Sequence, residues 1–190
     1  MDVLFINPDS SAKAYQDLAP VYAAIEPPTW SLLLAESCRA KGFGVAILDC
    51  DAEKLSLASA VTRVTDLKPR LLVFAVYGQN PNSGTTSMIG ALDLARAIKA
   101  AGIATPICFV GSHTSALPNE VLAFDCVDLV LLNEGVYALH HLLRSNLRDD
   151  LAHIKGIGYK KAGPGSFRTP VLNAPQSVVP QARMDEDLPG

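Results

Sequence analysis

The stretch Val73-Phe-Ala-Val-Tyr-Gly-Gln-Asn-Pro-Asn82 decides the fold. It begins inside the apolar run Leu71–Val76, which has the length of a buried strand, and it precedes a helical pattern that starts near Gly84. A strand that ends in a polar, Gly- and Asn-rich loop before a helix is typical of open α/β sheets. Because such sheets bind ligands at the carboxyl ends of their strands, this loop predicts a binding site.

Length and composition indicate one α/β domain with a small addition. The chain has 190 residues, of which 49% are hydrophobic, and a net charge of −3 without a basic stripe, which argues against a nucleic-acid partner. Its apolar runs reach about six residues, far short of the roughly 20 that a membrane span needs. The start of the chain, residues 1–5, has no basic region of a signal peptide, so we expect a cytoplasmic protein.

Five apolar segments that alternate with helical patterns predict a parallel, doubly wound sheet. We expect the flavodoxin-like (Rossmann-like) strand order 2-1-3-4-5. A helix is predicted to start near Thr29, which is a plausible N-cap. The predicted strands are residues 3–6, 45–48, 71–76, 106–110 and 127–132.

The chain changes character after Ile154, and we expect three parts. Residues 1–154 form the α/β domain, and residues 155–172 form a β-hairpin appendage around a Gly- and Pro-rich turn. Residues 173–190 contain three prolines and the acidic run Asp185-Glu186-Asp187. That composition predicts an extended tail that links to another domain and lies outside the core.

This chain lacks the residues that several common binding sites of this fold require. A phosphoacceptor receiver needs acidic residues after strand 1, an Asp after strand 3 and a Lys after strand 5, where this chain has Asn7, Tyr77 and Asn133. The dinucleotide fingerprint needs a glycine-rich loop after strand 1, and residues 7–14 contain no glycine. The polar loops that remain could hold a large, flat ligand with a polar tail.

Four segments together resemble the N-terminal cobalamin (B12)-binding domain of class B radical SAM enzymes. The similarity covers roughly residues 2–172. The segments are the strand that runs into Asn7-Pro8, Glu26-Pro-Pro-Thr-Trp-Ser-Leu-Leu-Leu-Ala35, Gly111-Ser-His-Thr-Ser-Ala-Leu-Pro118 and Val130-Leu-Leu-Asn-Glu-Gly135.

The resemblance implies a corrin ring held over the carboxyl ends of the strands, and no catalytic residue in this chain. It also implies a methyltransferase-type enzyme with a radical SAM barrel in cis after residue 190. That barrel, which lies outside the given sequence, would carry S-adenosylmethionine and a [4Fe–4S] cluster. The positions that would face cobalamin are Asn7, Tyr77, Gly78, Gln79, Asn80, Gly111, Ser112, His113, Thr114, Asn133, Glu134 and Gly135.

Two departures from related patterns matter. The Asp-x-His-x-x-Gly motif of other cobalamin proteins is absent after strand 1, so no histidine of that loop is expected to bind cobalt. Asn133 stands where the radical SAM family usually has glycine. The alternative is a non-corrinoid flavodoxin-like domain that binds a small molecule or another protein.

Individual residues keep alternative roles. His113 could line the corrin pocket or only hold its loop, and Tyr77 could lie beneath the corrin or at the rim of the site. Glu134 could bind corrin amides or stabilise the start of the next helix. Other expectations are structural: Trp30 in the core, His140 and His141 on the surface, Asp49 in a turn, and ordinary buried thiols at Cys38, Cys50, Cys108 and Cys126.

Overall fold

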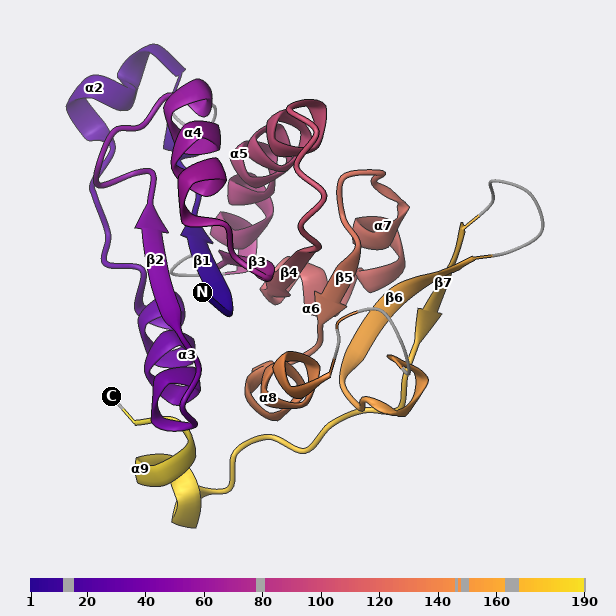
Figure 1. The fold of residues 1–190 in the computed structure, drawn as a ribbon. Helices are drawn as coiled ribbons and strands as arrows, with labels where there is room; N and C mark the ends of the chain where they lie inside the picture. The colour runs from indigo at the N-terminus through magenta and orange to yellow at the C-terminus, as the bar shows by residue number, and fades with distance from the viewer. Residues whose placement is uncertain (12–15, 78–80, 146, 148–150, 163–167, 190) are drawn as a thin grey trace.

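A single sheet organises the chain. In this computed structural model, which describes all residues except 12–15, 78–80, 146, 148–150, 163–167 and 190, the strand order is β2-β1-β3-β4-β5-β6-β7 (Figure 1). The first five strands are parallel and have the predicted 2-1-3-4-5 order. Their bounds are β1 (Val3–Asn7), β2 (Val45–Asp49), β3 (Leu71–Val76), β4 (Ile107–Gly111) and β5 (Leu129–Leu131).

The predicted hairpin exists, but the prediction of a five-stranded sheet was wrong. The strands β6 (Ile157–Ala162) and β7 (Arg168–Leu172) pair antiparallel with each other, and β6 also pairs antiparallel with β5. Without that pairing, β5 would present a row of unpaired backbone groups at the edge of the sheet. The hairpin therefore extends the sheet to seven strands.

Helices cover both faces of the sheet, as expected for a doubly wound fold (Figure 1). Side chains alternate between the faces along each strand, so Leu4 and Ile6 pack on one side while Val3 and Phe5 pack on the other. The first face is covered by α4 (Leu57–Leu67), α5 (Pro81–Ala100) and α7 (Pro118–Ala123), and the second by α3 (Thr29–Ala40) and α8 (Val136–Arg144).

The connection from β1 to α3 is partly helical. It contains the 3-10 turn η1 (Gln16–Leu18) and the short helix α2 (Ala19–Tyr22). The helix α3 begins at Thr29, but its cap is Pro28, and the Thr29 hydroxyl donates to the Pro27 carbonyl. The prediction of Thr29 as N-cap was therefore wrong by one residue.

The four cysteines are buried and free, which confirms their assignment as ordinary thiols. Burial raises the pKa of the Cys38 and Cys50 thiols to about 12. These thiols are thus protonated at neutral pH and poorly suited to act as nucleophiles or metal ligands.

The C-terminal tail packs against the domain. It is extended as expected only from residue 173 to Pro180, and then forms η3 (Gln181–Arg183) and α9 (Met184–Asp187), of which α9 contacts α3 (Figure 1). Val179 and Asp187 are buried at 4% and 1% exposure. A linker function for residues 173–190 stays a prediction.

One surface assignment was wrong. His140 is 3% exposed and points from α8 toward α3 and α9, whereas His141 is exposed as expected.

The remaining short elements are α6 (Ser112–Ala116) and η2 (Leu151–His153). No helix in the described ranges is long and apolar enough to cross a membrane.

Candidate functional site

The carboxyl ends of the parallel strands bring most of the predicted site residues to one edge of the sheet. In the pairing register, Val76 at the end of β3 lies beside Gly111 at the end of β4, and Asn7 at the end of β1 lies beside Asp49. We call this edge the rim: the last residues of β1, β3, β4 and β5 and the residues that follow them. Three predicted positions, Gly78, Gln79 and Asn80, lie outside the described residues.

At β1 the rim residue is Asn7, whose side-chain amide donates to Asp49 Oδ1 over 2.8 Å. The same Asp49 oxygen accepts the Ala52 N–H over 3.1 Å, so Asp49 is the last residue of β2 and its side chain bonds the turn that follows. The Asn7 side chain therefore joins the ends of β1 and β2. Next along the chain, the Ser10 hydroxyl donates to the Ser87 carbonyl over 2.9 Å, so this loop packs on α5.

At β3 the rim residue is Tyr77, which is half-buried against Trp30 at the start of α3. The two ring centroids are 5.2 Å apart with an interplanar angle of 47°. Burial and the Glu134 carboxylate raise the pKa of the Tyr77 hydroxyl to about 12, so it stays protonated at neutral pH. This hydroxyl donates to the Asn133 carbonyl over 3.2 Å and so connects the β3 and β5 ends of the rim. Trp30 packs against the hydrophobic core but is only partly buried, so its predicted place in the core is confirmed in part.

At β4 the chain makes a close approach that only glycine allows. Gly111 has φ of +157°, and a Cβ there would collide with the Val76 carbonyl of β3. The helix α6 begins directly afterwards, so Ser112, His113 and Thr114 are helical where the sequence predicted a loop. The Ser112 hydroxyl lies so close to Gly84 of α5 that a side chain at Gly84 would collide with it. The rim is thus tightly packed where β3 and β4 end.

The structure places His113 between two helices. Its Nδ1 lies 3.1 Å from the Thr85 hydroxyl of α5, and its Nε2 lies 3.9 Å from a Glu120 carboxylate oxygen of α7. Only 13% of the His113 side chain is exposed. Both ring nitrogens therefore face protein groups, which favours the role of holding the segment over that of an open metal ligand.

At β5 the backbone turns through two left-handed residues. Asn133 has φ of +56° and Gly135 has φ of +75°. Asparagine tolerates this conformation better than most residues, which explains why it can stand at a position where the resembling family has glycine. The Asn133 N–H donates to the Ser115 hydroxyl of α6 over 3.0 Å. This hydrogen bond connects the β5 end of the rim to α6, which follows β4.

Glu134 has a partner that the sequence did not indicate. Its Oε2 accepts the backbone N–H of Val179 over 2.8 Å, and Val179 belongs to the C-terminal tail. A small surface pocket separates the two segments and is lined by residues 132–138 and 176–178. The tail is consequently part of the β5 end of the rim.

Three buried polar side-chain atoms at this end of the molecule have no hydrogen-bond partner among the described residues: Trp30 Nε1, Ser31 Oγ and Thr114 Oγ1. Ser31 and Thr114 are 1% and 0% exposed. Such groups are rare because an unpaired buried donor or acceptor costs about 1–3 kcal/mol. Two of the three, Trp30 and Thr114, belong to segments that meet the rim, so a ligand with amide and phosphate oxygens fits these residues.

Metal-binding clusters are not apparent in the described ranges, where no group of three or more His, Cys, Asp or Glu side chains is arranged to hold an ion. The polar groups at the rim and beside it include the Tyr77 hydroxyl, the Asn7 amide, the Trp30 indole and the Glu134 carboxylate. These groups suit an organic ligand with many hydrogen-bonding substituents.

Comparison with known families decides between the classes of ligand. The family model described as the B12 binding domain matches residues 16–143, which is most of the chain. The chain belongs to the B12-binding domain family. The resemblance noted in the sequence is thus confirmed, and cobalamin, or B12, is the cofactor for which the family is named. No curated protein matches the chain.

Two solved structures share the fold of this B12-binding domain. The methyltransferase TsrM from Kitasatospora setae, a radical S-adenosylmethionine enzyme with cobalamin and a [4Fe-4S] cluster bound, superimposes with a TM-score of 0.68 at 16% identity. The match covers 95% of this chain and 30% of TsrM. OxsB, a cobalamin-dependent S-adenosylmethionine radical enzyme with aqua-cobalamin and S-adenosylmethionine bound, gives 0.65 at 17% identity, covering 98% of this chain and 23% of OxsB. This chain spans less than a third of either protein.

Several contacts of the site could not be read from the sequence. The Thr85, Ser115 and Val179 partners of the rim come from distant segments. Trp30 was visible as an aromatic residue near the start of a helix, and its position in the Glu26–Ala35 motif was the one signal that could have linked it to the site.

Proposed function

We propose that this chain is the cobalamin-binding domain of a radical S-adenosylmethionine enzyme of the methyltransferase type, and that it binds the cofactor without catalysing the reaction itself. The fold shared with TsrM and OxsB supports the kind of enzyme, and those proteins are much longer than this chain. A radical SAM domain would therefore follow in cis. Cobalamin in such an enzyme would carry a methyl group between S-adenosylmethionine and a substrate.

The observation that carries the proposal is the set of unpartnered donors near the rim. Trp30 Nε1 and Thr114 Oγ1 are buried without a partner among the described residues. Cobalamin offers amide carbonyls around its ring and a phosphate in its tail, and either would complete these hydrogen bonds. The crevice between β1 and β3, where the strand order reverses, is the usual ligand position in this fold.

The rim residues would orient the cofactor in different ways. The Tyr77 and Trp30 rings, which pack on each other, would provide aromatic surface for a flat macrocycle. Gly111 lets the backbone of β4 lie close to β3, so no side chain at this position would stand between the strands and the cofactor. Asn7 and His113 are held by Asp49 and Thr85 and would shape the site through their packing.

We also infer that no histidine of this chain binds cobalt. Residues 8–15, which follow β1, contain no histidine. The one histidine at the rim, His113, has its nitrogens against Thr85 and Glu120. Cobalt(II) electron paramagnetic resonance of the bound, reduced cofactor tests this inference. Nitrogen hyperfine splitting that disappears in His113→Ala would contradict it.

An ultraviolet–visible titration with hydroxocobalamin tests the proposal. We expect saturable binding, and a dissociation constant raised about 2- to 10-fold by Trp30→Phe, which removes a single hydrogen-bond donor and keeps an aromatic ring. Phe43→Tyr, a change of similar size in an aromatic residue packed on the α3–α8 face, serves as the control. Absence of a spectral change and of cofactor retention on gel filtration would favour a non-corrinoid domain.

A further inference from the structure

The residues after β7 form a strap across the domain, which we define as residues 173–188. The Asn173 side-chain amide donates to the Leu151 and Ile154 carbonyls over 2.6 and 2.8 Å. Farther on, Val179 is buried and its N–H binds Glu134 at the rim. Figure 1 shows the strap running past α8 to reach α3, where α9 packs. The strap therefore contacts the domain at both of its ends.

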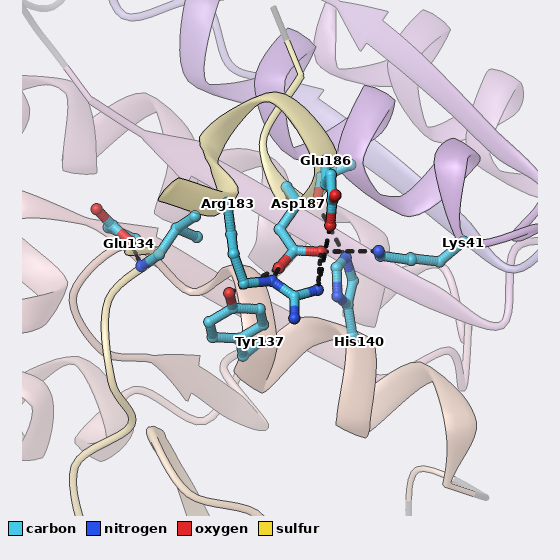
Figure 2. Close-up of polar contacts among 9 residues, drawn as sticks. Lys41, Glu134, Tyr137, His140, Arg183, Glu186 and Asp187 are labelled. Atoms are coloured by element: carbon cyan, nitrogen blue, oxygen red, sulfur yellow. Dashed lines mark hydrogen bonds and ion pairs between the residues drawn. The ribbon is translucent and has the colours of Figure 1, made fainter. Parts of the chain in front are cut away.

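The strap ends on a buried carboxylate. The side chain of Asp187 is 1% exposed, and Figure 2 shows it at the centre of a polar cluster. Its Oδ1 accepts from Lys41 Nζ over 2.8 Å, and its Oδ2 accepts from the Tyr137 hydroxyl over 2.8 Å and from Arg183 Nε over 2.7 Å. We call Ser37, Lys41, Tyr137, His140, Arg183 and Asp187 the anchor cluster.

The backbone of Asp187 is bound as well. The Ser37 hydroxyl of α3 donates to the Asp187 carbonyl, and the same hydroxyl lies 3.0 Å from His140 Nε2 of α8. Because Ser37 has one hydroxyl hydrogen, His140 Nε2 must carry a proton and donate to Ser37. A single residue of the strap thus joins α3 and α8 through its carboxylate and its carbonyl.

Burial separates Asp187 from the acidic residues beside it. Asp185 and Glu186 are exposed, whereas Asp187 is removed from water. A buried carboxylate is costly unless it is hydrogen-bonded and paired with positive charge, and Asp187 meets both conditions. Two of its partners, Lys41 and Tyr137, lie 146 and 50 residues away in the sequence, so these contacts fix the strap to the body of the domain.

We propose that Asp187 is a positioning residue that anchors the strap on α3 and α8, and that the anchored strap holds Glu134 at the β5 end of the rim and sets where the following chain leaves the domain. The last clause rests on the proposed function, in which a radical SAM domain follows. The strap thereby connects the cofactor rim with the start of that domain.

Amide hydrogen exchange without cobalamin tests the anchor directly. We compare Asp187→Asn with Asp185→Asn, which makes the same change at an exposed position of the same helix. In Asp187→Asn we expect exchange in residues 173–188, including the Val179 N–H, to be faster by about tenfold or more, with exchange in β1 and β3 unchanged. Exchange equal to that of Asp185→Asn would overturn the proposal.

A second variant keeps the test decisive if Asp187→Asn does not fold. Tyr137→Phe removes one hydrogen bond to Asp187 and keeps the ring. It should raise strap exchange about 3- to 10-fold, because one hydrogen bond is lost. Unchanged exchange in this variant would contradict the proposal that Asp187 anchors the strap.

A double-mutant cycle on hydroxocobalamin affinity tests the link to the rim. If the anchored strap holds Glu134, Asp187→Asn should weaken binding in the wild-type background and have little further effect in Glu134→Ala. Additive effects would contradict the coupling. If the wild-type chain does not bind cobalamin at all, the proposed function fails, while the exchange experiment still decides the anchor.

Discussion

The rim and the anchor cluster are both polar and partly buried, but their hydrogen bonds differ. Thr114 Oγ1 at the rim and Trp30 Nε1, whose ring packs on the rim residue Tyr77, have no partner among the described residues. In the anchor cluster, Asp187 has partners for both carboxylate oxygens and for its carbonyl. Since a folded chain seldom leaves buried polar groups unpaired, the first arrangement is expected where a ligand binds, and the second where the chain binds itself.

This difference predicts opposite consequences for mutation. Removing a polar group from the anchor cluster should destabilise the folded chain because its partners lose their hydrogen bonds. Removing an unpartnered polar group from the rim should leave stability unchanged or raise it, and should weaken cobalamin binding instead. The substitutions below test this contrast. The first concerns the close approach of β4 to β3, on which the shape of the rim depends.

Gly111→Ala should have the largest effect. The new Cβ would collide with the Val76 carbonyl, so β4 and β3 would have to separate at the rim. We expect the free energy of unfolding to fall by about 3 kcal/mol in urea denaturation. Gly102→Ala is the control because Gly102 has φ of +76° but nothing within 4 Å of the new Cβ. It should cost only about 1 kcal/mol, and equal losses in the two variants would contradict the close approach.

Ser37→Ala should come next. It leaves the Asp187 carbonyl and His140 Nε2 without their shared partner. We expect the free energy of unfolding to fall by about 2 kcal/mol. Ser31→Ala is a matched control on the same helix, since Ser31 is also buried but its hydroxyl has no partner among the described residues. Ser31→Ala should be neutral or stabilising, and a loss as large as that of Ser37→Ala would refute the contrast.

Acidic pH should weaken the anchor cluster. Burial, followed by the charges of Arg144 and Lys41, lowers the pKa of His140 to about 4, below its ordinary value near 6.5. Between these values the unfolded chain binds more protons at this residue, so its contribution to stability is present above pH 6.5 and is lost as the pH falls toward 4. The midpoint of urea denaturation should therefore decrease as the pH is lowered from 6.5 toward 4.

His140→Gln identifies the source of that slope, and His141→Gln is its control at an exposed neighbour. The slope should flatten only in His140→Gln. Asp187 titrates in a separate, lower range, because hydrogen bonds from Arg183, Lys41 and Tyr137 hold the pKa of its carboxyl well below the usual value. A slope unaffected by His140→Gln would show that other groups cause it.

Thr114→Val should have the smallest effect on stability, and with the opposite sign. The substitution removes a buried hydroxyl without a partner among the described residues and preserves the shape of the side chain. We expect thermal unfolding to shift upward by about 2–4 °C, and cobalamin affinity to fall about 2- to 10-fold. Thr62→Val, at an exposed hydroxyl that bonds the Ala58 carbonyl, should change neither property appreciably. A clear loss of stability in Thr114→Val would contradict the expectation that unpartnered rim groups do not stabilise the folded chain.

The sequence predicted the parallel sheet well because its strands are continuous apolar runs. Leu71–Val76, for example, is buried along its whole length, and the sequence and structure agree on its bounds. The pairing of β6 with β5 could not be predicted in the same way. The residues of a hairpin indicate that its two strands pair with each other, but they do not indicate which sheet edge the hairpin joins.

The anchor cluster was missed for a related reason. Asp187 lies in an acidic run that is typical of a solvated segment, and Lys41 and Tyr137 are distant in the sequence. A signal for His140 was present, since it lies four residues after Val136 on the inner face of α8. The rim was predicted as a location, but the partners of its side chains depend on long-range packing.

The central claim is that cobalamin binds at the rim and completes the hydrogen bond of the Trp30 indole. Trp30 is the only tryptophan in the chain, so a proton–nitrogen correlation spectrum should contain one indole Nε1–H signal. On titration with hydroxocobalamin, we predict that this signal shifts saturably, in parallel with the cofactor spectrum, and that its exchange with water slows. An indole signal that stays unchanged while cobalamin binds would place the cofactor elsewhere and contradict the account.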